Sequence, residues 1–196
     1  MPLKIADIQT LPIERPETKK LIPTQYYPIL TATPEQQTTW LAALVDSEGS
    51  ISLDLRRYEE RVGLELVIQI GNRNADIIAC VQQIVGFGAS HVQQNHLGRP
   101  YTHYTVACKQ ARTFLDRIKK YLVVKQPQSK LVDKFYALST GEHFHCSKPH
   151  KYTKEQIQCL IQLRKYNRSE EKLYLNPNFK LLLRKCNLKD LHYDAP

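Results

Sequence analysis

One acidic residue stands at the end of an apolar helical stretch, where it could bind a metal ion. The stretch 40–45 is apolar and is followed by Asp46, Ser47, Glu48 and Gly49. Glycine is a common helix terminator, so Glu48 is expected at the C-terminal helix end, where free carbonyl groups make the potential negative. An acidic side chain is unfavourable there unless a cation joins it, and carboxylate and carbonyl oxygens suit a hard divalent ion. An ordinary buried helix with an exposed acidic end explains the same residues equally well.

The helix that would carry Glu48 has a clear start signal. Thr33 precedes Pro34, and Gln36 follows Thr33 by three residues, which is a capping box with proline at the first helical position. The apolar residues that follow recur at the spacing of one helix face, namely Leu41, Leu44 and Val45. Ala42 and Ala43 have small side chains, so a second helix could approach closely at this point.

Two strand hairpins alternate with helices after Gly49. The alternation of apolar and polar residues predicts strands at 50–58, 62–70, 89–95 and 101–108. Helical spacing predicts helices at 72–85, 110–122 and 126–138. This order predicts an α+β fold, with an antiparallel four-stranded sheet that has helices on one face.

Residues 41–49, with the sequence LAALVDSEG, resemble the LAGLIDADG signature of homing endonucleases. Ala43 replaces the usual Gly, Val45 replaces Ile, Ser47 replaces Ala or Gly, and Glu48 is a known variant of Asp. Residues 125–128, with the sequence KQPQ, resemble the family's Lys-Gln-x-Gln turn, and the similarity covers residues 34–140. The resemblance implies a LAGLIDADG homing-endonuclease fold of order αββαββα, with a saddle-like sheet.

The resemblance also implies a catalytic centre. Glu48 and the carbonyl of Ser47 would bind Mg²⁺, with Mn²⁺ as a substitute and with Ca²⁺ binding without supporting cleavage. Asn72 matches the position that holds the nucleophilic water, and Lys125 matches the basic residue near the scissile phosphate. A helix N-cap is the simpler interpretation of Asn72, and a surface lysine that of Lys125. Asp76 departs from a basic residue of some members, which leaves a non-cutting protein open.

Only one copy of the acidic motif is present, and single-motif members of the family act as homodimers. Their motif helices pack across the two-fold axis, where each surface meets its own copy. The expected dimer interface consists of Leu41, Ala42, Ala43 and Val45.

The sheet face without helices would bind double-stranded DNA, because strands can enter the major groove and read base edges. Its expected contacts are mostly amides, hydroxyls, imidazoles and basic groups: Ser50, Ser52, Asp54, Arg56, Tyr58, Gln69, Arg73, His91, Gln93, Asn95, Thr102 and Tyr104. The formal charge of +9 and the pI of about 9.3 also favour a polyanionic partner. Any antiparallel sheet can instead show a polar face to water.

The chain divides into three predicted regions. Residues 1–32 are proline-rich and predict an extended arm, 33–140 form the endonuclease core, and 141–196 form a helical extension. From Lys148 onward there are 11 basic and 5 acidic residues, so the extension could support the core or touch phosphates. A zinc site at His143, His145, Cys146 and His150 is an alternative to a polar loop, but the spacing fits no tetrahedral pattern.

These observations predict a site-specific DNA endonuclease that is encoded within an intron and cuts a long pseudo-palindromic target as a homodimer. An intron RNA maturase and a non-cleaving DNA-binding protein remain alternatives on the same fold. No apolar run is long enough to cross a bilayer, and the N-terminus has no secretory signal. An intracellular location is expected, in a chloroplast, a mitochondrion or a prokaryotic cytoplasm.

Overall fold

The structure is a computed structural model that describes residues 27–59, 61–94, 98–138 and 152–188. After a short 3-10 helix η2 (Pro28–Thr31), the first half of the fold consists of α1 (Pro34–Glu48), β1 (Gly49–Tyr58), β2 (Arg61–Asn72), α2 (Ala75–Val85), β3 (Ala89–Gln94) and β4 (Pro100–Ala107). The second half consists of α3 (Cys108–Ile118), the 3-10 helix η3 (Lys119–Tyr121), α4 (Gln126–Ala137), α5 (Lys154–Tyr166), α6 (Glu170–Leu175) and α7 (Pro177–Lys185). Among all the residues that the structure describes, no helix is both long and apolar enough to span a membrane.

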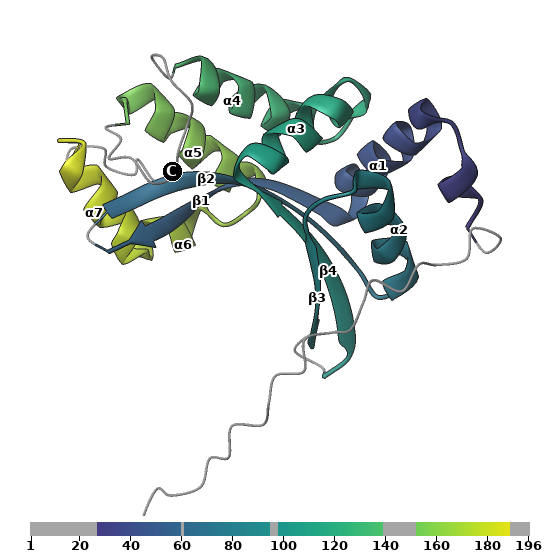
Figure 1. Cartoon of the computed structure of the whole chain (residues 1–196). Helices are drawn as coiled ribbons and strands as arrows, with labels where there is room; N and C mark the ends of the chain where they lie inside the picture. The colour runs from purple at the N-terminus through teal and green to yellow at the C-terminus, as the bar shows by residue number, and fades with distance from the viewer. Residues whose placement is uncertain (1–26, 60, 95–97, 139–151, 189–196) are drawn as a thin grey trace, which may run out of the picture.

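The strands form the predicted four-stranded antiparallel sheet, and their order in it is β1-β2-β4-β3. The sheet is strongly curved, and α1, α2, α3 and α4 lie above it in Figure 1. Beneath these helices the apolar side chains of β1 and β2 form the centre of the core: Ile51, Leu53, Leu64, Leu66, Ile68 and Ile70. The opposite, concave face of the sheet is left open by those helices.

Helix α1 begins with the predicted capping box. The Gln36 N–H donates to Thr33 Oγ1 at 3.3 Å, and the Thr33 N–H donates to Gln36 Oε1 at 3.0 Å. The helix then continues to Glu48, and its apolar residues Leu41 and Val45 are fully buried against the sheet. The packing of this face fixes where the C-terminal end of α1 lies.

Gly49 joins α1 directly to β1 in an extended conformation, with φ −100°. There is no room for a side chain at this position, because a Cβ atom would lie 2.8 Å from the Val45 carbonyl oxygen and 2.9 Å from the Gln69 carbonyl oxygen. Gly49 therefore lets the end of α1 and strand β2 approach closely, which holds Glu48 next to the sheet.

The register of the sheet decides which side chains share a face. His103 of β4 lies opposite both Gly71 of β2 and His91 of β3, so all three positions point to the open face. Thr102 and Tyr104 therefore point to the covered face, where both are buried. The prediction that these two residues lie on the open face is wrong, because strand β4 has the opposite phase.

The C-terminal helices pack against the β1–β2 end of the sheet (Figure 1). The predicted helical extension contains α5, α6 and α7, of which Thr153 caps α5 and Asn176 caps α7. Apolar residues of α5 and α7 belong to the same core as the rest of the chain, including Ile157, Leu160, Leu163, Phe179 and Leu182.

Helix α5 also covers the outer edge of β1. Arg164 Nη2 donates to the Leu53 carbonyl at 2.9 Å, and Asn167 Nδ2 donates to the Ile51 carbonyl at 2.9 Å. Exposed strand edges favour unwanted pairing with other chains. These two side chains satisfy the edge carbonyls and attach the end of α5 to the sheet.

Candidate functional site

Glu48 and Lys125 both lie at the C-terminal end of α1. Glu48 is the last residue of this helix and is exposed, whereas Lys125 immediately precedes α4 and is half-buried. The Lys125 ammonium donates to the Asp46 carbonyl at 2.5 Å. Because helix C-terminal carbonyls carry partial negative charge, the ammonium stabilises this helix end. Two residues that are 77 positions apart in sequence are thus held in one place by the fold.

Burial lowers the pKa of the Lys125 ammonium from its ordinary value, and the negative charges of Asp46 and Glu48 oppose this effect. A partly desolvated ammonium interacts more strongly with an anion than a fully hydrated one, since the surroundings screen it less. Lys125 is therefore suited to bind a phosphate next to Glu48, and the interpretation of Lys125 as a plain surface lysine does not fit its burial.

Asp46 was not among the predicted site residues, yet it makes two of the hydrogen bonds that hold Lys125 in place. Its carboxylate accepts the Lys125 N–H at 2.8 Å and the Val123 N–H at 2.7 Å. The two backbone groups belong to the 122–125 loop between η3 and α4. This contact spans 77 to 79 residues in sequence, so no local signal indicates it.

Asn72 lies at the end of β2, and its Oδ1 accepts the Asn74 N–H at 2.8 Å. Asn74 is the residue that caps α2, because its side chain accepts the Asp76 N–H. The interpretation of Asn72 as the helix N-cap is therefore wrong, and its role in holding water stays a prediction. Arg73, the next residue, is exposed.

Asp76 has a structural role in the first turn of α2. Its carboxylate accepts the Tyr27 hydroxyl at 2.9 Å, which ties the segment before α1 to α2. An acidic residue at a helix N-terminus is also favoured by the helix dipole. These contacts give a reason for an acidic residue at this position.

Tyr101, at the start of β4, lies at the same end of the sheet. A side chain at Gly71 would overlap the Tyr101 ring, so the two residues are in close contact. Burial raises the pKa of the Tyr101 hydroxyl, the Glu48 charge raises it further, and the Arg73 charge opposes them. Tyr101 was missed by the sequence analysis, although an isolated glycine within a strand often marks such a close approach.

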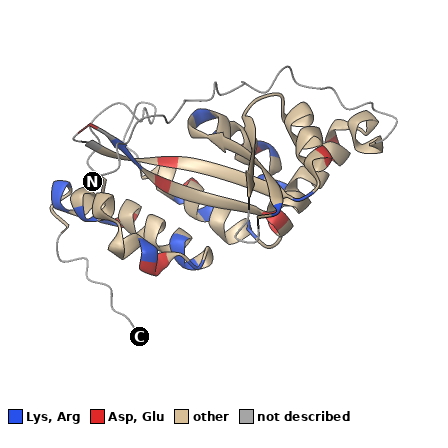
Figure 2. Cartoon of the chain, turned by 90° about the horizontal axis from the view of Figure 1, so that it is seen from below, with Lys and Arg blue, Asp and Glu red and all other residues tan. Residues whose placement is uncertain are grey.

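The open face of the sheet carries most of the predicted DNA contacts. Those that lie there are Ser50, Ser52, Asp54, Arg56, Gln69, His91 and Gln93. The register adds three residues of β4 and one of β2 that the sequence analysis missed, namely Tyr101, His103, Thr105 and Glu65. The side chain of Tyr58 and all of Asn95 lie outside the described residues. Figure 2 shows the chain from below, the side to which the open face of the sheet is turned.

Several side chains of the open face are held by neighbours. Arg56 Nε donates to Glu65 Oε2 at 2.7 Å, and the rings of His91 and His103 stack with centroids 5.5 Å apart. Asp54 accepts both Arg164 Nη2 and the Ser52 hydroxyl at 2.9 Å. Such contacts fix the direction of polar side chains, which reduces the entropy lost when they bind a ligand.

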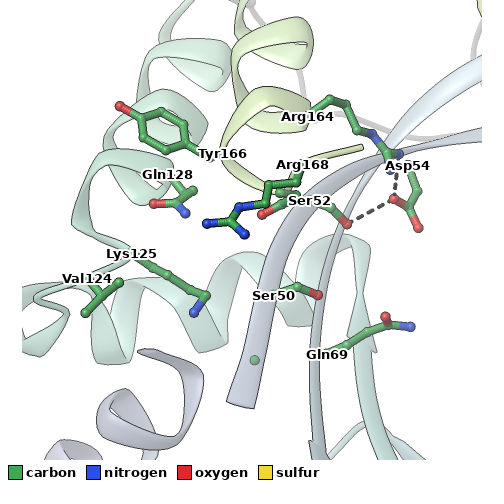
Figure 3. Close-up of a pocket in the computed structure, with 12 residues that line it drawn as sticks. Ser50, Ser52, Asp54, Gln69, Val124, Lys125, Gln128, Arg164, Tyr166 and Arg168 are labelled. Atoms are coloured by element: carbon green, nitrogen blue, oxygen red, sulfur yellow. Dashed lines mark hydrogen bonds and ion pairs between the residues drawn. The ribbon is translucent and has the colours of Figure 1, made fainter. Parts of the chain in front are cut away.

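A groove of about 520 Å³ opens between the sheet, the 122–125 loop and the end of α5 (Figure 3). Lys125, Arg164 and Arg168 line it together with polar residues of the sheet, and Arg168 reaches between Gln128 and Ser52. Gln128 is buried, and its Oε1 has no hydrogen-bond partner among the described residues. The groove is thus a mainly basic, polar channel that begins beside the end of α1.

The residues at the end of α1 fit a divalent metal ion in type but not in number. A carboxylate of Glu48 and a carbonyl of Ser47 are hard oxygen ligands of the kind Mg²⁺ prefers. Within the described part of the chain, however, no group of three or more His, Cys, Asp or Glu side chains could hold a metal ion. Further ligands would come from water, a bound phosphate or a second copy of the chain. The predicted alternative zinc site at 143–150 lies outside the described residues.

No protein-family model matches the sequence, and no curated protein matches it either. Among solved structures, the archaeal intron-encoded homing endonuclease I-Vdi141I, in complex with DNA, superposes with a TM-score of 0.54. It is 19% identical, and the match covers 82% of this chain and 100% of that one. The chain has the LAGLIDADG homing-endonuclease fold.

Two further solved structures match with lower TM-scores. The homing endonuclease I-CvuI, in complex with its target in the presence of Ca, has a TM-score of 0.49 at 18% identity, covering 79% of this chain and 96% of that one. The homing endonuclease I-TnaI has a TM-score of 0.46 at 17% identity, covering 80% and 97%.

The burial of residues in α1 corrects the predicted dimer interface. Leu41, Ala42 and Val45 have no exposed surface, so they cannot contact a partner and this prediction is wrong. Their apolar spacing reflects packing on the chain's own sheet. Ala43 is exposed, and it lines a hollow of about 470 Å³ on the outer face of α1 together with Glu35, Gln36, Thr39 and Trp40.

Proposed function

We propose that the chain is a site-specific DNA endonuclease that acts as a homodimer with a divalent metal ion. One observation carries the proposal: the ammonium of the half-buried Lys125 binds the Asp46 carbonyl at the end of α1, where Glu48 is the last residue, next to the open polar face of a curved sheet. A carboxylate beside an ammonium, at the edge of a surface that can follow a groove of DNA, is an arrangement suited to phosphodiester hydrolysis.

Each side chain of the centre has a proposed role. Glu48 and the Ser47 carbonyl hold Mg²⁺ or Mn²⁺, which would activate water and stabilise the charge that develops on the phosphate. Lys125 binds the scissile phosphate through its ammonium and offsets the same charge. Asn72 orients the water through its amide, since it lies at the end of the strand next to this centre.

Base recognition is assigned to the open face. Alternate residues of neighbouring strands present hydroxyl, amide, imidazole and guanidinium groups, which are the groups that read base edges in the major groove. The groove beside α5 is assigned to the DNA backbone, because Arg168 and Lys125 can contact phosphates whatever the sequence. The core and the C-terminal extension would thus bind the same duplex.

The homodimer is proposed because one chain supplies only one copy of Glu48, whereas a double-strand break requires two cleaved phosphates. The exposed face of α1 around Ala43 and Trp40 would meet its own copy across a two-fold axis. This arrangement places the two Glu48 side chains near the axis and predicts a pseudo-palindromic target.

The test is cleavage of a DNA duplex that spans the uninterrupted insertion site of this reading frame, with Mg²⁺ and with a chelator. The proposal predicts a double-strand cut that requires the metal ion. Binding without any cut in Mg²⁺ or Mn²⁺ would contradict it and would favour a maturase or a non-cleaving DNA-binding protein.

A further inference from the structure

Asp46 is the acidic residue of the 41–49 motif to which the proposed reaction gives no role. Its carboxylate accepts the backbone N–H groups of Val123 and Lys125 at 2.7 and 2.8 Å, one on each oxygen. Its own carbonyl accepts the Lys125 ammonium at 2.5 Å. Asp46 therefore holds both the backbone and the side chain of Lys125.

Leu122 anchors the start of the 122–125 loop in the core, but the residues after it have few other contacts that could fix their position. Val123 and Val124 are 81% and 67% exposed, so two of its apolar side chains contribute little packing. Lys125 precedes the first turn of α4 without making a side-chain cap of its own. The loop would thus lose its main attachment to α1 if the Asp46 carboxylate were removed.

Asp46 is also close to the reacting groups along the chain. It belongs to the last turn of α1, two residues before Glu48. The rigid helix therefore fixes the distance from Asp46 to Glu48, and the hydrogen bonds fix the distance from Asp46 to Lys125. Misplacing a catalytic group by about 1 Å can reduce a rate by about 100-fold.

We propose that Asp46 is a positioning residue that fixes Lys125 relative to Glu48. The inference rests on the proposed function, in which Lys125 contacts the scissile phosphate. Asp46 touches no substrate atom in this account, and it acts only through the 122–125 loop. Most of the proposed DNA contacts lie on the sheet and on Arg164 and Arg168, so DNA binding depends only weakly on Asp46.

Two substitutions at Asp46 remove one or both of the hydrogen bonds that its carboxylate accepts. Asp46→Asn keeps one acceptor oxygen and turns an NH₂ group toward the other backbone N–H, so one of the two hydrogen bonds is lost. Asp46→Ala loses both. The single-turnover cleavage rate at saturating DNA is expected to fall about 10-fold in the first variant and about 100-fold in the second. DNA affinity should stay within about threefold of the wild type.

A double-mutant cycle with Lys125→Ala distinguishes positioning from a general structural defect. If Asp46 acts through Lys125, Asp46→Asn causes no further loss of rate in the Lys125→Ala background. Multiplied losses would overturn the proposal. Asp116→Asn is the matched control: it removes the same charge from an exposed carboxylate of α3 and should leave the rate unchanged.

Hydrogen exchange of the peptide that contains the 122–125 loop gives a readout that does not depend on activity. The Val123 and Lys125 amides should exchange at least 10-fold faster in Asp46→Ala, while the amides of the core strands stay protected. Unchanged exchange overturns the positioning role. A wild type that fails to cut while the exchange rises as expected overturns the proposed function instead, and the two failures are thus distinguishable.

Discussion

The ring of Tyr101 packs directly against Gly71, where the strands β2 and β4 approach the end of α1. The contact is possible only because residue 71 has no side chain. It directs an aromatic hydroxyl toward the end of the sheet at which Glu48 and Arg73 influence its pKa. A tyrosine that the sequence analysis did not select therefore belongs to the candidate site.

Gly71→Ala is expected to displace Tyr101 and destabilise the protein by about 1–3 kcal/mol, as overpacking of a tight contact does. Urea unfolding measures the loss. In a Tyr101→Ala background the new methyl group meets no ring, so the same substitution should cost less than about 1 kcal/mol. An equal cost in both backgrounds would show that the ring is not the obstacle.

Tyr104→Phe tests whether Tyr104 of β4 points to the covered face of the sheet, as the strand register indicates. The buried Tyr104 hydroxyl donates to the Phe87 carbonyl at 2.9 Å. Its removal should cost about 1–3 kcal/mol of unfolding free energy, because the carbonyl loses its partner. DNA affinity should not change, whereas a tyrosine on the DNA-binding face would weaken binding when altered. Tyr166→Phe, at an exposed position, is the stability control.

The same variant predicts a pH dependence. Burial raises the pKa of the Tyr104 hydroxyl well above its usual range. The unfolded chain would lose this proton above about pH 10 while the folded chain keeps it, so the wild type loses up to about 1.4 kcal/mol of stability per pH unit there. Tyr104→Phe lacks this contribution. The stability difference between the two proteins should therefore shrink between pH 9 and 11, and a constant difference would contradict the burial of the hydroxyl.

The elements of this fold could be predicted because their signals are local. The capping box at Thr33, the proline after it and the alternation in both hairpins lie within a few residues of the structure they indicate. The face of β4 was misassigned because the pairing with β2, and not alternation alone, sets it. Val106 carried a usable signal: it is apolar and shares its phase with Tyr104, so both belong to the core.

The candidate site was only partly predictable for a different reason. Glu48 and Lys125 were found through their motifs, but Asp46 contacts residues 77 to 79 positions away and Arg164 contacts Asp54 across 110 positions. Such contacts leave no local pattern. The apolar spacing of α1 has the same form whether it packs on its own sheet or on a partner helix, which explains the misassigned interface at Leu41, Ala42 and Val45.

Arg168 tests the groove beside α5. Arg168→Ala should weaken binding to DNA of any sequence severalfold. The slope of log affinity against log salt concentration should also fall, by the amount expected for the loss of about one phosphate contact. Arg168 has a left-handed backbone, with φ +49°, so Arg168→Gly removes the same guanidinium while relieving strain. A loss of affinity in both variants, measured by salt titration, identifies the guanidinium as the cause. Lys180→Ala, an exposed lysine of α7 outside the groove, should have no such effect.

Ala43 tests the dimer. Ala43→Arg places a long charged side chain on the exposed face of α1, and it should convert a dimer into a monomer in sedimentation velocity experiments. Double-strand cleavage should be lost with it, since one chain supplies one Glu48. Ala137→Arg, at an exposed alanine of α4, is the matched control and should stay dimeric. A dimeric Ala43→Arg protein would place the interface elsewhere.

The most direct test of the account is Glu48→Gln, measured for DNA binding and for cleavage on the same duplex in Mg²⁺. The amide keeps the size of the side chain but removes the charge that would hold the metal ion. The account predicts a cleavage rate at least 1,000-fold lower, with DNA affinity within about threefold of the wild type. Cleavage at the wild-type rate would contradict the assignment of Glu48 and, with it, the proposed catalytic centre at the end of α1.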